Sequence, residues 1–89
     1  MRSPVRFVRS ASTAPPSALL QEAAWAERVG NRIRDLRESA GLTQSELARR
    51  AGLLQSYISR LENGEGSVSE RTLRKIARAL RVRIERINP

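Results

Sequence analysis

Residues 42–64 read LTQSELARRAGLLQSYISRLENG, and this stretch predicts two short helices joined by a three-residue corner. Thr43 and Glu46 have the spacing of a capping box, in which each side chain binds a free backbone N–H at the start of a helix. We therefore expect a helix over 44–51 that stops at Gly52. A glycine-containing corner of this length between two helices is the signature of a helix-turn-helix.

The helix that follows the corner is predicted over 55–63 and has an unusual start. It ends at Asn63 and Gly64, because glycine adopts the left-handed conformation at little cost. Its capping position carries Leu54, which cannot accept a hydrogen bond as Ser, Thr, Asp or Asn would. Relative to serine, the loss is about 1 kcal/mol. A residue that lowers helix stability without a visible gain nearby is typical of functional positions.

A longer helix is predicted upstream, from a cap at Ser17 to about Ser39, closed by Gly41. Apolar residues recur on one face at steps of three and four. They are Trp25, Val29, Ile33, Leu36 and Ala40. This periodicity predicts that one side of the helix is buried.

The segment VSERTL repeats the capping pattern downstream, with Ser69 as the cap and Val68 and Leu73 as a hydrophobic staple. Apolar residues then continue with helical spacing to Leu80. Residues 82–87 fit either a buried helical turn or a short strand, and we prefer the turn. The five predicted helices, with connections of a few residues, indicate a compact all-α domain.

Two regions follow from this reading: a helix-turn-helix domain over 17–89 and a flexible basic N-terminal arm over 1–16. The arm is rich in Ser, Pro, Ala and Arg and has little periodicity. An inert tail, a start codon placed too early and a targeting peptide are the alternatives for this stretch.

The composition favours a polyanionic partner. The 89 residues carry 17 Lys and Arg, sixteen of them Arg, against nine Asp and Glu, for a net charge of +8. Neither cysteine nor histidine occurs, which excludes disulfides, thiolate metal sites and the commonest general base. No run of eighteen apolar residues is present, so we expect no membrane span.

The outer face of the 55–63 helix carries groups suited to reading DNA bases. Gln55 can bond adenine through two hydrogen bonds, and Arg60 can do the same with guanine. Ser56 and Ser59 can serve either base. Polar outer faces are also the default on surface helices, but the preceding corner and the net charge favour a reading role.

The segment from Gly41 to Leu80, GLTQSELARRAGLLQSYISRLENGEGSVSERTLRKIARAL, resembles the Xre-type, phage-repressor-like helix-turn-helix family. LTQSELARRAG is similar to the second helix of that family, QSYISRLENG to its recognition helix, and LRKIARALRVRIERI to its fourth and fifth helices. The resemblance covers roughly residues 24–87. It implies a five-helix, lambda-repressor-like domain that inserts residues 55–60 into the major groove of DNA.

The resemblance also implies roles for individual residues. It implies base contacts at Gln55, Ser56 and Arg60, and Ser59 joins these candidates only because it lies on the same outer face. It implies phosphate contacts at Gln44 and Asn63. Tyr57 is a further candidate from its own chemistry, since its ring and hydroxyl suit stacking or a phosphate bond as well as a half-buried packing role. Arg37 and Glu62 match a buried structural ion pair between the first and third helices.

Leu54 departs from the family pattern, which commonly has Ser or Thr at this position. It can pack on Tyr57 and nearby apolar surface, or it can touch a thymine methyl group. It can also mean that the helix begins one residue differently, which would put the role of Gln55 in doubt. We favour simple packing.

We expect a cytoplasmic, sequence-specific double-stranded-DNA-binding transcriptional regulator, a repressor that associates with the nucleoid when bound to DNA. It should form a homodimer, with Val82, Ile84 and Ile87 as candidate contacts. The alternatives are the antitoxin of a toxin–antitoxin pair, a restriction–modification control protein, or a protein-interaction module. We expect no enzyme, cofactor or metal, because phosphate loops, metal-spaced ligands and nucleophile–base pairs are missing from the sequence.

Overall fold

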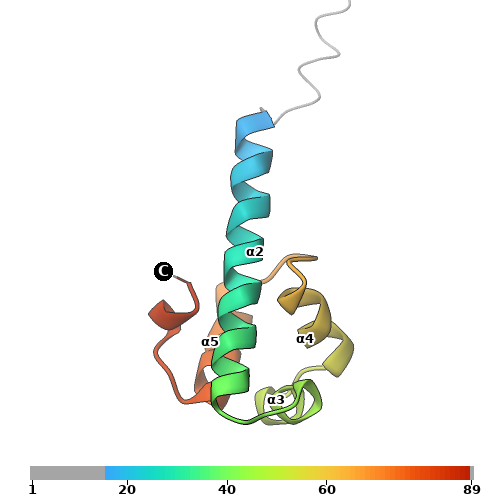
Figure 1. Ribbon diagram of the computed structural model, residues 1–89, viewed down its shortest axis with the longest axis vertical. Coiled ribbons are helices and arrows are strands. Elements are labelled where there is room, and N and C mark those ends of the chain that lie inside the picture. The colour runs from blue at the N-terminus through green and yellow to red at the C-terminus, as the bar shows by residue number, and fades with distance from the viewer. Residues whose placement is uncertain (1–15, 89) are drawn as a thin grey trace, which may run out of the picture.

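The computed structural model describes residues 16–88, with side chains from Leu20 onward, and every regular element within that range is helical. The elements are α2 (Pro16–Ser39), α3 (Gln44–Ala51), α4 (Gln55–Glu62), α5 (Glu70–Leu80) and the 3-10 turn η1 (Ile84–Arg86). The N-terminal half of α2 stands clear of the other helices, which gather around its C-terminal half (Figure 1). None of these helices is long and apolar enough to cross a bilayer. The arm expected over 1–16 falls almost wholly outside the described residues.

The all-helical prediction is confirmed, and so is the preferred helical turn within 82–87, but the count of five helices is wrong. Residues 82–87 contain only one 3-10 turn, η1. Arg81 ends α5 in the left-handed conformation, with φ 60, and Arg83 is extended, with φ −77 and ψ 149. Too few residues remain before the buried Ile87 for an α-helix to propagate. The strand alternative for this segment is excluded as well.

The helix starts follow the sequence signals with one exception. The Thr43 hydroxyl accepts the Glu46 N–H at 3.0 Å, and the Glu46 carboxylate accepts the Thr43 N–H at 2.8 Å. The backbone hydrogen bond from Thr43 lowers the pKa of Glu46. Ser69 caps α5 as predicted. The predicted cap at Ser17 is wrong, because α2 begins at Pro16, whose fixed φ suits the first helical position.

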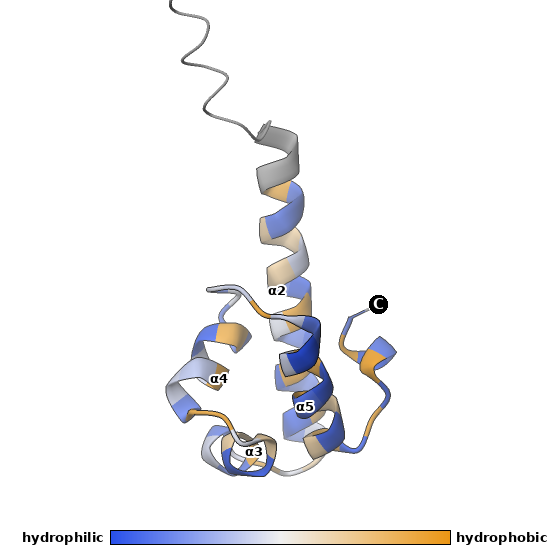
Figure 2. Cartoon of the chain, turned by 180° about the vertical axis from the view of Figure 1, so that it is seen from behind, coloured by the Kyte–Doolittle hydropathy of each residue, from blue (hydrophilic) through white to orange (hydrophobic). Residues whose placement is uncertain are grey.

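The core is aliphatic and draws on all four α-helices and on Leu42 and Ile87 outside them. Hydrophobic and hydrophilic residues alternate along the helices, as expected where one side of each helix is buried (Figure 2). The largest fully buried side chains are Val29, Ile33, Leu47, Ile58, Leu73, Ile76 and Ile87. This core fixes the orientation of α3 and α4 relative to α2 and α5.

Gly30 allows α2 and α4 to approach backbone to backbone. A Cβ atom at Gly30 would lie 2.2 Å from the Leu61 carbonyl oxygen and 3.0 Å from that of Glu62. The C-terminal half of α4 is therefore seated on α2 at a point where only glycine fits. No role was predicted for Gly30, although an isolated glycine within a helical pattern often has a packing role.

We expect Gly30→Ala to lower the free energy of unfolding by about 1–3 kcal/mol or more, because the new methyl group overlaps the backbone of α4. Urea denaturation measures the change. Asn31→Ala, at the exposed neighbouring position, is the control and should be neutral or slightly stabilising. Intrinsic helix propensity alone predicts that Gly30→Ala stabilises, and that result would contradict the close approach.

Candidate nucleic-acid interface

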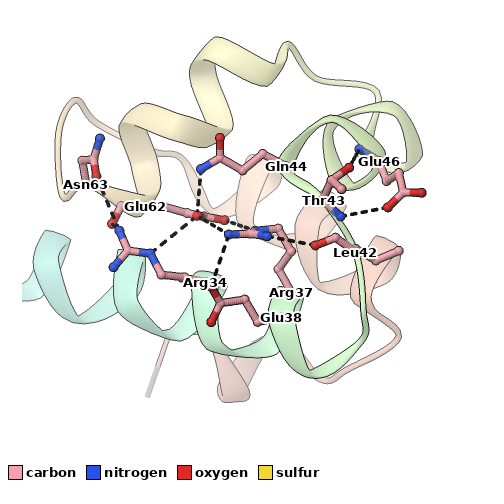
Figure 3. Close-up of polar contacts among 9 residues, drawn as sticks. All are labelled: Arg34, Arg37, Glu38, Leu42, Thr43, Gln44, Glu46, Glu62 and Asn63. Carbon is pink, nitrogen blue, oxygen red and sulfur yellow. Dashed lines mark hydrogen bonds and ion pairs between the residues drawn. The ribbon is translucent and has the colours of Figure 1, made fainter.

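A buried ion pair between Arg37 of α2 and Glu62 of α4 lies at the centre of the site (Figure 3). Arg37 Nε lies 2.6 Å from Glu62 Oε2, and Arg37 Nη2 lies 2.9 Å from Glu62 Oε1. Arg37 Nη1 also donates to the Leu42 carbonyl at 2.9 Å. Glu62 is only 2% exposed. Two hydrogen bonds from one guanidinium to both carboxylate oxygens are the strong, bidentate form of an Arg–carboxylate contact.

The ion pair remains charged inside the protein. Burial acts to raise the pKa of Glu62, but hydrogen bonds from Arg37 and Gln44 outweigh it and hold the pKa below its ordinary value. The hydrogen bond with Glu62 raises the pKa of Arg37. A buried charge of this kind is tolerated because its partners satisfy it.

Gln44, the first residue of α3, joins the same network. Its Nε2 donates to Glu62 Oε1 at 3.0 Å. A carboxylate only accepts, so the amide nitrogen of Gln44 must face Glu62 and the amide oxygen must face away. Gln44 can still offer a phosphate its second Nε2 hydrogen and the backbone N–H groups at the start of α3.

The outer face of α4 is open to solvent. Gln55, Ser56 and Arg60 are exposed, and Ser59 is half-buried. Arg60 lies over the loop that follows α4, because a Cβ atom at Gly66 would be 3.5 Å from Arg60 Nη2. The structure therefore places the four predicted base-contacting residues on one helix, and three of them are freely accessible.

Tyr57 and Asn63 differ in their availability for phosphate. Tyr57 is half-buried against the core, and its hydroxyl donates to the Ser67 carbonyl at 3.2 Å. The hydroxyl proton is thus engaged, which leaves Tyr57 less suited to bind phosphate than predicted. Asn63 is exposed and is the C-cap of α4, which ends one residue earlier than expected.

Leu54 is exposed and does not pack as predicted. The favoured packing role is wrong, because Leu54 is 73% exposed. The helix α4 begins at Gln55 as predicted, which excludes a shifted start. Leu54 occupies the N-cap position, where its side chain makes no hydrogen bond. Leu54 instead borders an open hollow of about 400 Å³. The hollow is lined by Gly52, Leu53, Leu54, Ser56, Tyr57 and Arg60.

The three candidate dimer contacts separate into two groups. Ile87 has 0% exposure and closes the core, so it offers no surface to a partner and is withdrawn as a candidate. Val82 and Ile84 are half-buried and border a shallow hollow of about 300 Å³ beside α5. Its other lining residues include Arg74 and Arg78.

The charge of Glu62 makes stability depend on pH. Its folded pKa lies below the ordinary value of 4.5. Ionised Glu62 therefore stabilises the fold above the unfolded pKa, and this contribution is lost as the pH falls through the folded pKa. We expect the difference in unfolding free energy between the wild type and Glu62→Gln to be largest near pH 7 and to shrink below about pH 4.

Glu38→Gln is the matched control for this pH series. Glu38 lies 3.9 Å from the same Arg37 but is exposed, so its replacement should have a small effect at every pH. Urea denaturation between about pH 2 and pH 7 gives both differences. A wild-type advantage over Glu62→Gln that stays constant or grows in acid would contradict the ion pair.

Comparisons with known proteins agree with this geometry. The helix-turn-helix family HTH_3 matches residues 33–87. The chain is 40% identical over 62 residues to y4dJ of Sinorhizobium fredii, an uncharacterized HTH-type transcriptional regulator, covering 68% of this chain and 80% of the relative. It is 37% identical over 59 residues to the immunity repressor protein of Bacillus phage phi105, covering 66% of this chain and 41% of the repressor.

A solved structure shares the fold over most of the described helices. The crystal structure of the restriction-modification controller protein C.AhdI from Aeromonas hydrophila superposes with a TM-score of 0.70 and 36% sequence identity. The match covers 72% of this chain and 97% of C.AhdI. With the family match spanning more than half of the sequence, the chain belongs to the helix-turn-helix family HTH_3.

Proposed function

We propose that this protein is a transcriptional repressor that binds a specific sequence of double-stranded DNA. The observation that carries the proposal is the exposure of Gln55, Ser56 and Arg60 on α4, a helix whose opposite side is fixed in the core by Ile58 and Glu62. These exposed groups match the hydrogen-bonding edges of bases in the major groove. The net charge of +8 supports attraction to the phosphate backbone.

The relatives support a regulatory role. One is a phage immunity repressor, and the structural neighbour C.AhdI is a restriction-modification controller. From these proteins we extend to this chain the role of a DNA-binding regulator. We do not extend to it the genes that they regulate.

We further propose that the protein binds as a two-fold dimer through Val82 and Ile84. These residues border the hollow beside α5 and are the half-buried apolar side chains of the C-terminal segment. Two copies related by a two-fold axis would read half-sites about one helical turn apart.

Selection from random duplexes, followed by a salt titration, tests the function. We expect a preferred, near-palindromic sequence, and affinity for preferred and random duplexes that falls steeply with salt. Gln55→Ala should cost about 1–3 kcal/mol on the preferred site and relax the preference at one position. Equal affinity for all sequences at every salt concentration would rule out a sequence-specific reader.

Leu54 generates a separate prediction about base preference. An exposed leucine at the start of α4 is suited to apolar contact with a thymine methyl group. We expect Leu54→Ser to stabilise the fold by about 1 kcal/mol, because serine supplies the missing cap. The same substitution should weaken the preference for thymine at one position of the selected sequence.

Replacing that thymine by deoxyuridine, which lacks only the methyl group, is the matched control on the DNA. The wild type should lose affinity on the deoxyuridine duplex, and Leu54→Ser should bind both duplexes equally. If Leu54→Ser keeps the wild-type preference for thymine over deoxyuridine at every position, Leu54 makes no methyl contact.

A further inference from the structure

We infer that Arg34 is a positioning residue that turns the side-chain amide of Asn63 toward a phosphate of the DNA backbone. The inference rests on the proposed function and adds a residue that the sequence analysis did not assign. Arg34 lies on α2, one turn before Arg37, and reaches the end of α4. Figure 3 shows its guanidinium extending to both Glu62 and Asn63.

Three contacts hold Arg34 in place. Its Nη2 donates to the Glu62 carbonyl oxygen at 2.8 Å and to Asn63 Oδ1 at 3.4 Å. Its Nε lies 3.7 Å from Glu62 Oε1. The positive charge therefore sits at the C-terminus of α4, where the helix dipole favours it. The backbone of Asn63 is fixed as well, since its N–H donates to the Ser59 and Arg60 carbonyls at 3.1 Å.

The chemistry of these groups sets the direction of the Asn63 amide. A guanidinium has hydrogen-bond donors and no acceptor, so only the amide oxygen of Asn63 can face Arg34. The amide nitrogen then points away from Arg34, and Asn63 is exposed. A phosphate oxygen only accepts hydrogen bonds, so an outward nitrogen with two hydrogens is the matching group.

Gln44 provides the contrast within the same network. Its nitrogen faces the Glu62 carboxylate, which leaves its oxygen outward. Of the two amides predicted to bind phosphate, Asn63 therefore presents the better donor. The difference arises because one amide faces a buried anion and the other faces Arg34.

The experiment compares Arg34→Gln, Asn63→Ala and the double variant on the selected duplex at several salt concentrations. Arg32→Gln is the matched control, because it removes one positive charge from the same helix and Arg32 instead donates to the Arg86 carbonyl at 3.0 Å. We expect Arg34→Gln to lose about tenfold more affinity than Arg32→Gln, the scale of one hydrogen bond to a charged group. In the Asn63→Ala background, Arg34→Gln should cost no more than Arg32→Gln does.

Two results would overturn the inference. Equal losses from Arg34→Gln and Arg32→Gln would show that Arg34 has no particular role. Additive losses from Arg34→Gln and Asn63→Ala, with a salt slope reduced by about 0.9, would show that Arg34 contacts a phosphate itself. Should Arg34→Gln unfold, Arg34→Lys replaces it in the same cycle, because lysine keeps the charge but cannot reproduce the planar fork.

Duplex binding by the wild-type chain shows whether the inference alone fails or the proposed function fails with it. If the wild type binds no duplex, the proposed function and the inference both fall. If it binds the selected duplex and the Arg34 and Asn63 losses are not coupled, only the inference falls.

Discussion

The ion pair between Arg37 and Glu62 is the interaction on which the arrangement of the helices depends. Two opposite charges are removed from water, and their attraction offsets that cost only because the geometry is close and further hydrogen bonds complete it. Gln44 satisfies one of these bonds, so a single carboxylate ties α2, α3 and α4 together. No buried side-chain polar atom in the described residues lacks a hydrogen-bond partner.

This arrangement leaves one side of α4 fixed and the other free. Gly30 brings α2 against the α4 backbone, and Ile58 and Leu61 fill the core beneath it. The opposite side of α4 can therefore carry polar groups, and its N-cap position can carry a leucine, without loss of the fold. Leu54 is exposed and its side chain makes no cap hydrogen bond, so nothing within the chain offsets the stability that is lost there.

Local signals in the sequence predicted much of the fold. The Thr43–Glu46 box and the Ser69 cap depend on neighbouring residues, and the structure forms both. The end of the chain was harder, because the left-handed Arg81 and the burial of Ile87 are set by tertiary packing. Gly30 was missed for the same reason, since its role depends on a helix some thirty residues away.

The sequence predicted which residues make up the candidate site, but not how their side chains are oriented. The outer face of α4 follows from helical spacing, and Gln55, Ser56 and Arg60 are exposed on it. The ion pair came from family resemblance, because no local pattern links residues 25 positions apart. The amide directions of Gln44 and Asn63, and the part that Arg34 plays, needed the distances between side chains.

A double-mutant cycle with Arg37→Lys and Glu62→Gln, measured both in unfolding free energy and in affinity for the selected duplex, examines the ion pair itself. The two side chains contact each other and tie α4, the proposed recognition helix, to α2. A coupling energy of at least about 1 kcal/mol is therefore expected in stability, with a matching loss of duplex affinity. Additive effects on stability, or duplex affinity that stays at the wild-type level in both single variants, would contradict this role of the pair.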